Sequence, residues 1–387
     1  MQRVVVVGAG LAGLQTVVAL RGAGYAGALT LLGAEPQPPY DRPPLSKELL
    51  RGEIEDSTLD ADWRTLRVDL QLGRAATGLQ DGAVVTGAGP VPFDGLVIAT
   101  GASPVRLPGE SSAMTLRTSQ DGHALRQRLV PGARLVIVGA GWIGAEIATA
   151  AVAAGVQVTV VEAAASPLAG SLPADCGERM LPWWSGVDLR LGSSVDAVEG
   201  DAVHLVDGDR LAADVVLVAI GVRPDTAWLA GTEVTLSPRG AVAVNAGLRT
   251  TVPGVFAVGD CAAWDSSRYG TRMHVEHWDN ALRAPAVAAA NLLGAAESYD
   301  PVPYFWSEQW GRMVQYAGHH PAGDRVVWRD EGERWAAFWL AGTRLVAALT
   351  VDRPRDLMQA RRLMTDGREV DADRIADPAV PVKAAAV

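Results

Sequence analysis

The feature that most constrains this chain is a glycine motif that occurs twice. Residues 4–13 read VVVVGAGLAG and residues 135–144 read LVIVGAGWIG. In each copy a β-branched run leads into Gly-x-Gly-x-x-Gly, and an apolar, alanine-rich stretch follows. This strand–turn–helix pattern lets the backbone approach a pyrophosphate at a helix N-terminus. Two copies in one chain predict two dinucleotide-binding domains.

The similarity of the two halves continues past the glycines. VDLQLG at 68–73 resembles VDLRLG at 187–192, and each half closes on an apolar strand with a small-residue turn, at 96–101 and 216–221. Each glycine motif also precedes one predicted helix and a second strand, which is a βαβ pattern. The chain is therefore predicted to be α/β, with two Rossmann-like units in succession.

A third region follows the second copy. The run TTVPGVFAVGDCA at 250–262 predicts a buried strand, and an apolar helix is expected over 280–293. The composition changes near residue 296, and five of the twelve tryptophans lie beyond it. This last part alternates like an antiparallel sheet and ends in an amphipathic helix near 353–364. It predicts a smaller α+β domain over 296–387.

Each glycine motif is followed by a carboxylate at the end of its second strand. Glu35 lies 22 residues past Gly13, where an acid accepts ribose hydroxyls. Glu162 takes the corresponding place in the second copy. A carboxylate there binds the 2′-hydroxyl of NAD and repels the 2′-phosphate of NADP, and residues 163–166 (AAAS) contain no arginine for that phosphate. The second unit is expected to prefer NADH, with NADPH the weaker ligand.

Lysine is almost absent from this chain. Of 34 basic residues only Lys47 and Lys383 are lysine. Lys383 lies in a small-residue tail that we expect to be frayed. Lys47 ends the run YDRPPLSK, which predicts a rigid extended loop, with Ser46 or Ser57 capping a helix. An ammonium group is a compact point charge that an arginine fork does not match.

Composition excludes several classes of function. The net charge is −10 and the pI about 5.1, which argues against nucleic acid or an anionic membrane as the main partner. No run of about 20 apolar residues is present, so no membrane insertion is expected. Two cysteines, Cys176 and Cys261, cannot form a CxxC pair or a four-cysteine metal site. We expect no metal site, and a reducing, cytoplasmic location.

The ordered set of motifs resembles a known family. Besides the two glycine motifs it comprises YDRPPLSK at 40–47, ATG at 99–101, GDC at 259–261, EHWDNA at 276–281 and YDPVPYFWSEQ at 299–309. Together they resemble the FAD-dependent, NADH-linked ferredoxin reductases of bacterial oxygenase and cytochrome P450 systems, which are glutathione-reductase-like flavoproteins. The resemblance covers nearly the whole chain. It implies a discontinuous FAD domain, an NAD domain and a C-terminal α+β domain, with these boundaries: 1–105 plus 235–295, 106–234, and 296–387.

The resemblance also implies the residues that hold each cofactor. On the FAD side these are Gly8, Gly10, Ala12, Gly13, Glu35, Arg42, Lys47, Ala76, Thr100, Gly101, Arg117, Asp260 and Trp278. On the NADH side they are Gly139, Gly141, Ile143, Gly144, Glu162 and Gly221.

Three residues are expected to act in the reaction itself. By resemblance Lys47 pairs with Glu146 near the flavin, where a fixed ammonium stabilises the negative charge that reduction adds. A structural salt bridge between domains is the alternative. Trp142 is expected to cover the nicotinamide face of the flavin until NADH displaces it; ordinary interface packing is the alternative. Trp278 and Trp306 are expected to line the side facing the acceptor, or to be core residues.

The expected reaction passes hydride from NADH to the flavin N5 and then two single electrons to a [2Fe–2S] ferredoxin, which serves an oxygenase or a cytochrome P450. The loop from Tyr40 to Leu50 contains no cysteine, so thiol chemistry is not expected. An acidic ferredoxin requires a local basic face. Its candidates are Arg268, Arg272, Arg283, Arg312 and the cluster Arg353–Arg362, although ordinary solvated surface is the simpler interpretation. The alternatives are an NADH oxidase or quinone reductase, and an NADH-sensing flavoprotein of the apoptosis-inducing type.

Overall fold

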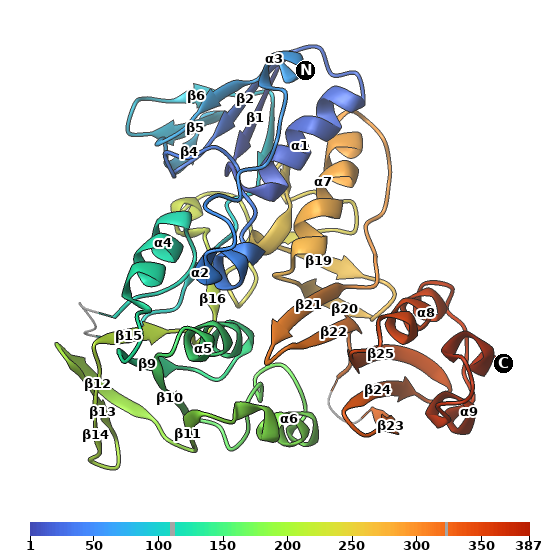
Figure 1. The fold of residues 1–387 in the computed structure, drawn as a ribbon. Helices are drawn as coiled ribbons and strands as arrows, with labels where there is room; N and C mark the ends of the chain where they lie inside the picture. The colour runs from blue at the N-terminus through green and yellow to red at the C-terminus, as the bar shows by residue number, and fades with distance from the viewer. Residues whose placement is uncertain (109–112, 322–323) are drawn as a thin grey trace.

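The first dinucleotide-binding unit is a parallel sheet of five strands in the order β18-β7-β1-β2-β3. The computed structural model describes residues 1–108, 113–321 and 324–387 (Figure 1). Helix α1 follows β1, and helix α7 packs beside it on the same face of the sheet. The elements are β1 (Arg3–Val7), α1 (Leu11–Gly22), β2 (Ala28–Leu32), β3 (Asp69–Gln71), β7 (Gly95–Ile98), β18 (Val255–Ala257) and α7 (Trp278–Leu292).

The second unit repeats this plan with four parallel strands in the order β11-β10-β9-β15. Helix α5 follows β9 as α1 follows β1, and its alanine-rich face packs on the buried valines and isoleucine of the sheet. The elements are α4 (Ser119–Arg128), β9 (Arg134–Val138), α5 (Trp142–Ala153), β10 (Gln157–Glu162), β11 (Val187–Leu191) and β15 (Val215–Val218).

The duplication seen in the sequence extends to the small sheets. In each unit the chain forms a three-stranded antiparallel sheet after the third strand of the parallel sheet and before the fourth, counted along the sequence. In the first unit this sheet is β4 (Ala76–Gln80), β5 (Ala83–Thr86) and β6 (Val91–Pro92); in the second it is β12 (Val195–Glu199), β13 (Ala202–Leu205) and β14 (Arg210–Ala212). The fold predicted from the repeat, two Rossmann-like units, is confirmed.

The chain crosses between the units on two adjacent strands. β8 (Ala102–Pro104) pairs antiparallel with β16 (Val222–Pro224), after which the chain returns to the first unit to supply β18 and α7. A further sheet of β17 (Val242–Val244), β19 (Ala262–Ser266) and β20 (Thr271–His274) lies beside α7. Residues far apart in sequence thus complete one sheet. The precise domain boundaries stay a prediction.

The C-terminal part is an antiparallel sheet of five strands in the order β21-β22-β25-β24-β23, covered by helix α8. Two of its tryptophans, Trp335 and Trp339, are buried in it. Its elements are β21 (Tyr304–Gln309), β22 (Arg312–Gly318), β23 (Arg325–Glu331), β24 (Arg334–Ala341), β25 (Arg344–Val351), α8 (Pro354–Thr365) and α9 (Ala372–Ala376). Among the described residues no helix is both long and apolar enough to cross a bilayer.

Two local expectations were wrong. The tail around Lys383 is not frayed, because Val382 and Ala385 are buried against the core of the C-terminal domain and a bridge joins Val370 to Ala386. The YDRPPLSK run is not an extended loop: Pro43–Ser46 forms a 3-10 helix that continues into the short helix α2 (Glu48–Arg51).

The expected serine caps are also absent from this segment. Helix α2 has Lys47 at its N-cap and no side-chain cap, and the Ser57 hydroxyl donates to the Asp41 carbonyl instead. The two prolines fix the turn, and the apolar side chains of Leu45 and Leu49 anchor it in a small core. Lys47 is therefore held at the junction of two short helices.

Candidate functional site

One cavity of about 2140 Å³ collects nearly every residue predicted for the cofactors. It lies where the carboxyl ends of the strands of both parallel sheets open toward each other, as ligand sites do in α/β folds. Of the predicted residues only Gly13 and Gly144 are not in its wall. The predicted residues that line it are Gly8, Gly10, Ala12, Glu35, Arg42, Lys47, Ala76, Thr100, Gly101, Arg117, Gly139, Gly141, Trp142, Ile143, Glu146, Glu162, Gly221, Asp260 and Trp278.

The first glycine motif has three glycines with three different constraints. Gly8 has a φ of 111°, and a Cβ placed there would lie 2.2 Å from the Ala99 carbonyl oxygen. A Cβ at Gly13 would lie 1.8 Å from the Gly8 carbonyl oxygen. A Cβ at Gly10 meets nothing within 4 Å, because this glycine borders the cavity. Two glycines therefore close the strand–helix turn, and the third leaves room for a ligand.

The second motif repeats this arrangement. Gly139 has a φ of 106°, and a Cβ on Gly144 would lie 2.1 Å from the Gly139 carbonyl oxygen. A Cβ on Gly141 approaches nothing closer than 3.9 Å. Helices α1 and α5 both begin at the cavity, with N-caps Gly10 and Gly141 that make no side-chain cap. The first amides of a helix bind anions, so both termini fit the pyrophosphate of a dinucleotide.

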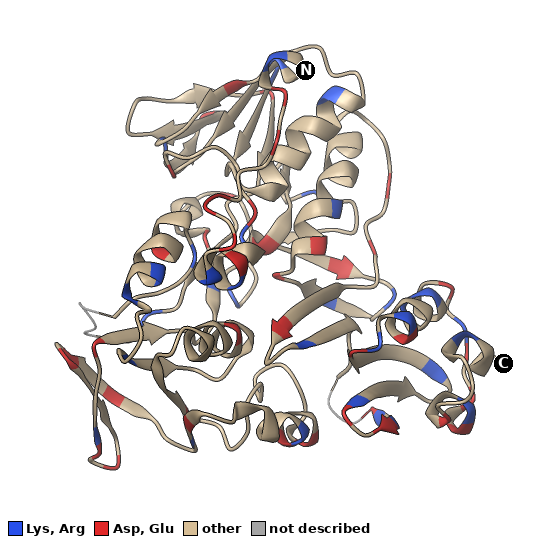
Figure 2. Ribbon diagram, in the orientation of Figure 1, with Lys and Arg blue, Asp and Glu red and all other residues tan. Residues whose placement is uncertain are grey.

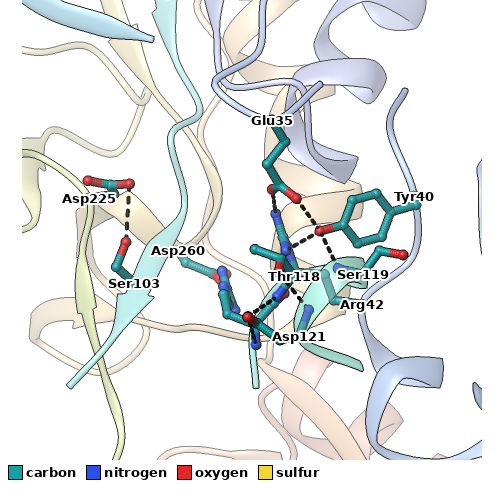
Figure 3. Close-up of polar contacts among 10 residues, drawn as sticks. Glu35, Tyr40, Arg42, Ser103, Thr118, Ser119, Asp121, Asp225 and Asp260 are labelled. Carbon is teal, nitrogen blue, oxygen red and sulfur yellow. Dashed lines mark hydrogen bonds and ion pairs between the residues drawn. The ribbon is translucent and has the colours of Figure 1, made fainter. Parts of the chain in front are cut away.

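Glu35 is held by side chains from the following loop (Figure 3). The Tyr40 hydroxyl donates to Glu35 Oε2 at 2.5 Å, and Arg42 Nη2 donates to Glu35 Oε1 at 2.8 Å. The Ser119 amide in turn donates to the Tyr40 oxygen at 3.1 Å. Burial raises the pKa of Tyr40 to about 12, so the phenol stays a donor at neutral pH. Sequence reasoning proposed Glu35 and Arg42 separately but missed Tyr40, although it opens the YDRPPLSK run.

Arg117 and Asp260, both predicted to lie near the flavin, form an ion pair. Arg117 Nη2 donates to Asp260 Oδ2 at 2.9 Å. The backbone amide of Arg117 donates to Asp121, which with Thr118 forms the capping box of α4 (Figure 3). The start of α4 is thereby fixed against the turn that carries Asp260. The Nε of Arg117 is buried and has no hydrogen-bond partner, so a donor remains in the cavity wall.

The predicted tryptophan of the acceptor side, Trp278, is fixed by its indole. Its Nε1 donates to Asp41 Oδ1 at 2.8 Å, and its ring meets that of Trp306 edge-on at 5.8 Å. Both rings line the cavity. The structure therefore brings the two tryptophans together at the junction of α7 and β21.

Glu162 is oriented by backbone amides of the second unit. Its Oε2 accepts from the Ala140 amide at 2.8 Å, and its Oε1 accepts from the Ala164 amide at 2.9 Å. Ala140 is the second residue of the second glycine motif, so the carboxylate is fixed beside the helix terminus that would take the pyrophosphate. Glu162 also lines the cavity.

Lys47 and Glu146 form the most buried ion pair that involves predicted site residues. Lys47 Nζ lies 2.7 Å from Glu146 Oε2, and the two side chains are 7% and 3% exposed. Glu146 is on α5 of the second unit, and Lys47 follows the 3-10 helix of the first. Two serines that sequence reasoning did not connect with this pair, Ser46 and Ser307, also donate to Glu146. The pair thus lies where three parts of the chain meet.

Trp142, the first residue of α5, contacts the C-terminal domain. Its ring meets that of Phe305 edge-on at 4.8 Å, and the Phe305 ring lies 4.6 Å from that of His277. Burial lowers the pKa of His277 to about 4, so this ring is neutral at neutral pH. Trp142 therefore sits in an uncharged aromatic wall of the cavity. Sequence reasoning missed Phe305 and His277, which pack there only in the folded chain.

The predicted basic face is less positive than its arginines suggest. Figure 2 shows several of them on and near α8. Arg283 and Arg361 both bind Asp279, and Arg353 binds Glu331 and Asp356. Four more of these arginines pair with an acid or a carbonyl of the same chain: Arg272 with Asp265, Arg312 with Glu333 and Asp352, Arg362 with Asp366, and Arg268 with the Met364 carbonyl.

Neither cysteine is placed for redox chemistry. Cys176 lies in the helix α6 (Ala174–Met180), and burial raises the pKa of its thiol to about 12. Cys261 is buried behind the Gly259–Cys261 turn, where its Sγ contacts the carbonyls of Ile98 and Val258. Burial raises the pKa of this thiol as well. Both sulfurs stay protonated and are enclosed by core residues.

Comparison with known proteins gives consistent matches over the whole chain. The family model for pyridine nucleotide-disulphide oxidoreductases matches residues 2–284, and a reductase C-terminal model matches residues 304–386. The ferredoxin--NAD(+) reductase component of the p-cumate 2,3-dioxygenase system of Pseudomonas putida is 35% identical, with 100% of this chain and 99% of that protein covered.

Two solved structures have closely similar folds. The crystal structure of Fdr9 has a TM-score of 0.95 and 47% identity, with 99% of both chains covered. The reductase in the covalent putidaredoxin reductase–putidaredoxin complex has a TM-score of 0.94 and 31% identity, and the match covers 99% of this chain and 97% of that one.

Substitutions at Gly10 and Gly13 should distinguish the effect of the first motif on ligand binding from its effect on stability. We expect Gly10→Ala to fold with a free energy of unfolding within about 1 kcal/mol of the original protein but to bind FAD at least about tenfold more weakly, because its methyl group enters the space left for the ligand. Gly13→Ala should lose about 2 kcal/mol or more, because its Cβ has no space.

Denaturant unfolding and a flavin-fluorescence titration measure the two effects. Gly22→Ala, at the far end of the same helix with open space around it, is the matched control: it should leave FAD affinity unchanged and should not lower the free energy of unfolding. Unchanged FAD affinity in Gly10→Ala would refute the assignment of the first motif.

Proposed function

The chain belongs to the pyridine nucleotide-disulphide oxidoreductase family, and on that premise we propose that it is a ferredoxin–NAD(+) reductase that takes electrons from NADH through FAD. The family implies a flavin and a pyridine nucleotide. The observation that carries the proposal is that both glycine motifs open into one cavity. Two dinucleotides bound there would bring a nicotinamide to a flavin.

Bound FAD supplies a centre that accepts hydride and releases electrons one at a time. The residues proposed to hold it are Gly8, Gly10, Ala12, Gly13, Glu35, Arg42, Ala76, Thr100, Gly101, Arg117, Asp260 and Trp278, and those proposed for the nicotinamide cofactor are Gly139, Gly141, Ile143, Gly144, Glu162 and Gly221. Lys47, oriented by Glu146, is proposed to stabilise the negative charge of the reduced flavin. Trp142 is proposed to cover the nicotinamide face of the flavin until NADH displaces it.

The proposed role of Lys47 follows from charge. An ammonium fixed in a buried wall stabilises negative charge that develops beside it, and it needs no reorganisation at that moment. Glu146 keeps this ammonium oriented at 2.7 Å, although burial of either charge alone is costly. Lys47 supplies the positive charge, and Glu146 determines where that charge lies.

A protein electron carrier is the acceptor that the site supports best. Both thiols are buried and protonated, so the chain has no disulfide to exchange with a substrate. The p-cumate relative is named as the ferredoxin reductase component of a dioxygenase system, and the putidaredoxin complex holds a similar reductase with its electron carrier. We propose a [2Fe–2S] ferredoxin for this chain, acting for an oxygenase or a cytochrome P450. The free thiols fit a reducing, cytoplasmic location, which we propose with it.

We expect ferredoxin to increase NADH-dependent cytochrome c reduction about tenfold or more over the reductase alone, since the ferredoxin supplies the one-electron route. The association rate should fall as salt rises if opposite charges guide docking. Rapid peroxide formation with no effect of ferredoxin would favour an NADH oxidase instead. Slow turnover with every acceptor, together with a change in mass on adding NADH, would favour a sensor.

We further propose that NADH is the preferred donor. The kcat/KM for NADH should exceed that for NADPH at least about tenfold. Glu162→Ala should lower this ratio, because the carboxylate that repels a 2′-phosphate is removed. Glu199→Ala, which removes an exposed carboxylate from β12 of the same unit, is the control and should leave the ratio unchanged. Equal kcat/KM values for the two nucleotides in the original protein would overturn the assignment.

A further inference from the structure

Ser307 belongs to the YDPVPYFWSEQ run but has no role in the function argued so far. It lies on β21 of the C-terminal domain and is 1% exposed. Its hydroxyl donates to Glu146 Oε1 at 2.6 Å across 161 residues of sequence. Glu146 Oε2 accepts from Lys47 and Ser46, so each carboxylate oxygen has its own donors. Ser307 is thus the C-terminal domain's contribution to the Lys47–Glu146 pair.

The contact is one of three that hold β21 and the residue after it, Trp310, against a single face of α5. Phe305 meets Trp142, Ser307 meets Glu146, and the Trp310 amide donates to Thr149 Oγ1 at 3.0 Å. Positions 142, 146 and 149 lie on one side of a helix, and Phe305 and Ser307, as alternate residues of a strand, point to one side of the sheet. Trp310 follows the end of β21 and contacts α5 through its backbone amide. The strand is therefore held in register along the helix, with Ser307 at the centre of the contact.

A neighbouring amide fixes the direction of the Ser307 hydrogen bond. Gln309 Nε2 donates to Ser307 Oγ at 3.4 Å, two residues along the same face. A carboxylate only accepts, so the single hydroxyl proton of Ser307 points at Glu146 while its oxygen accepts from Gln309. Gln309 is itself 1% exposed. Its Oε1 is buried without a hydrogen-bond partner, so the contact of Gln309 within this group is the one made by its Nε2.

We propose that Ser307 is a positioning residue that sets the electrostatic influence of Lys47 on the flavin, an inference that rests on the flavin assignment above. Its hydroxyl donates a hydrogen bond to one oxygen of Glu146, so that Lys47 and Ser46 need to stabilise the negative charge only on the other oxygen. Without it, Oε1 is buried with no donor and the carboxylate turns toward the ammonium. Lys47 is then more fully neutralised by Glu146 and stabilises the reduced flavin less.

The direct readout is the midpoint potential of the bound flavin, measured by dye equilibration. In Ser307→Ala we expect the ratio of reduced to oxidised flavin at a fixed potential to fall between about threefold and tenfold. A tenfold fall corresponds to a shift of about 30 mV for a two-electron couple. Ser307→Thr keeps the hydroxyl and should restore most of the shift.

The decisive comparison measures the effect of Ser307→Ala on the potential in a protein that also carries Glu146→Gln. If Ser307 acts through the carboxylate, Ser307→Ala should produce no further shift once Glu146 is an amide. Thr350→Val is the matched control: it removes another fully buried hydroxyl from the same sheet, one with no hydrogen-bond partner. It should leave the potential unchanged.

An unchanged potential in Ser307→Ala, or an equal shift in the Glu146→Gln background, overturns the proposal and leaves Ser307 as a structural contact. The potential is measured without ferredoxin, so a failure of the acceptor assignment does not affect this test. If Lys47→Met also leaves the potential unchanged, the Lys47–Glu146 pair has no effect on the flavin, and the proposed role of Ser307 fails together with that of the pair.

Discussion

The buried pair of Lys47 and Glu146 is the interaction on which the arrangement of the site depends. Two charges taken out of water are seldom a net gain in stability, even when they meet. Here the cost is offset by hydroxyl groups on both carboxylate oxygens, supplied by the 3-10 helix before α2 and by β21. Because the partners of Glu146 come from two distant parts of the chain, Ser46 with Lys47 and Ser307, the full set of contacts forms only when those parts are docked. The charge in the cavity wall and the assembly of the domains are therefore linked.

The duplicated units explain why the cavity lies where it does. Each parallel sheet ends in a glycine turn and an uncapped helix terminus, the two chain crossings, β8 and β16, pair with each other between the units, and both glycine turns line one cavity. Neither unit alone encloses a ligand between two such termini. The C-terminal sheet then covers the remaining side with aromatic rings, Phe305 and Trp306 among them. Its strand β21 contacts both α5 and the cavity, so it shares in the site as well as covering it.

The sequence could predict what depends on local geometry. The glycine turns, the βαβ units and Glu162 follow from residues within about thirty positions of one another, and the repeat made them visible. Lys47 stood out because the chain contains one other lysine, but its pairing with Glu146 came from resemblance to a family. His277 and Ser307 were missed because their contacts join segments that meet only after docking, whereas Tyr40 was missed although its hydrogen bond to Glu35 spans only five residues. The tail was misjudged because Val382–Ala385 forms a single 3-10 turn, and two buried apolar residues are too few to show a periodic pattern in the sequence.

The most direct test of the account is stopped-flow reduction of the bound flavin by NADH in Lys47→Met. Removing the fixed ammonium should slow the reduction about tenfold or more, since the developing negative charge loses its partner. Lys383→Met, the change at the only other lysine, is the control and should reduce at the original rate. An unchanged rate in Lys47→Met would contradict the account and reduce the pair to a structural link between domains.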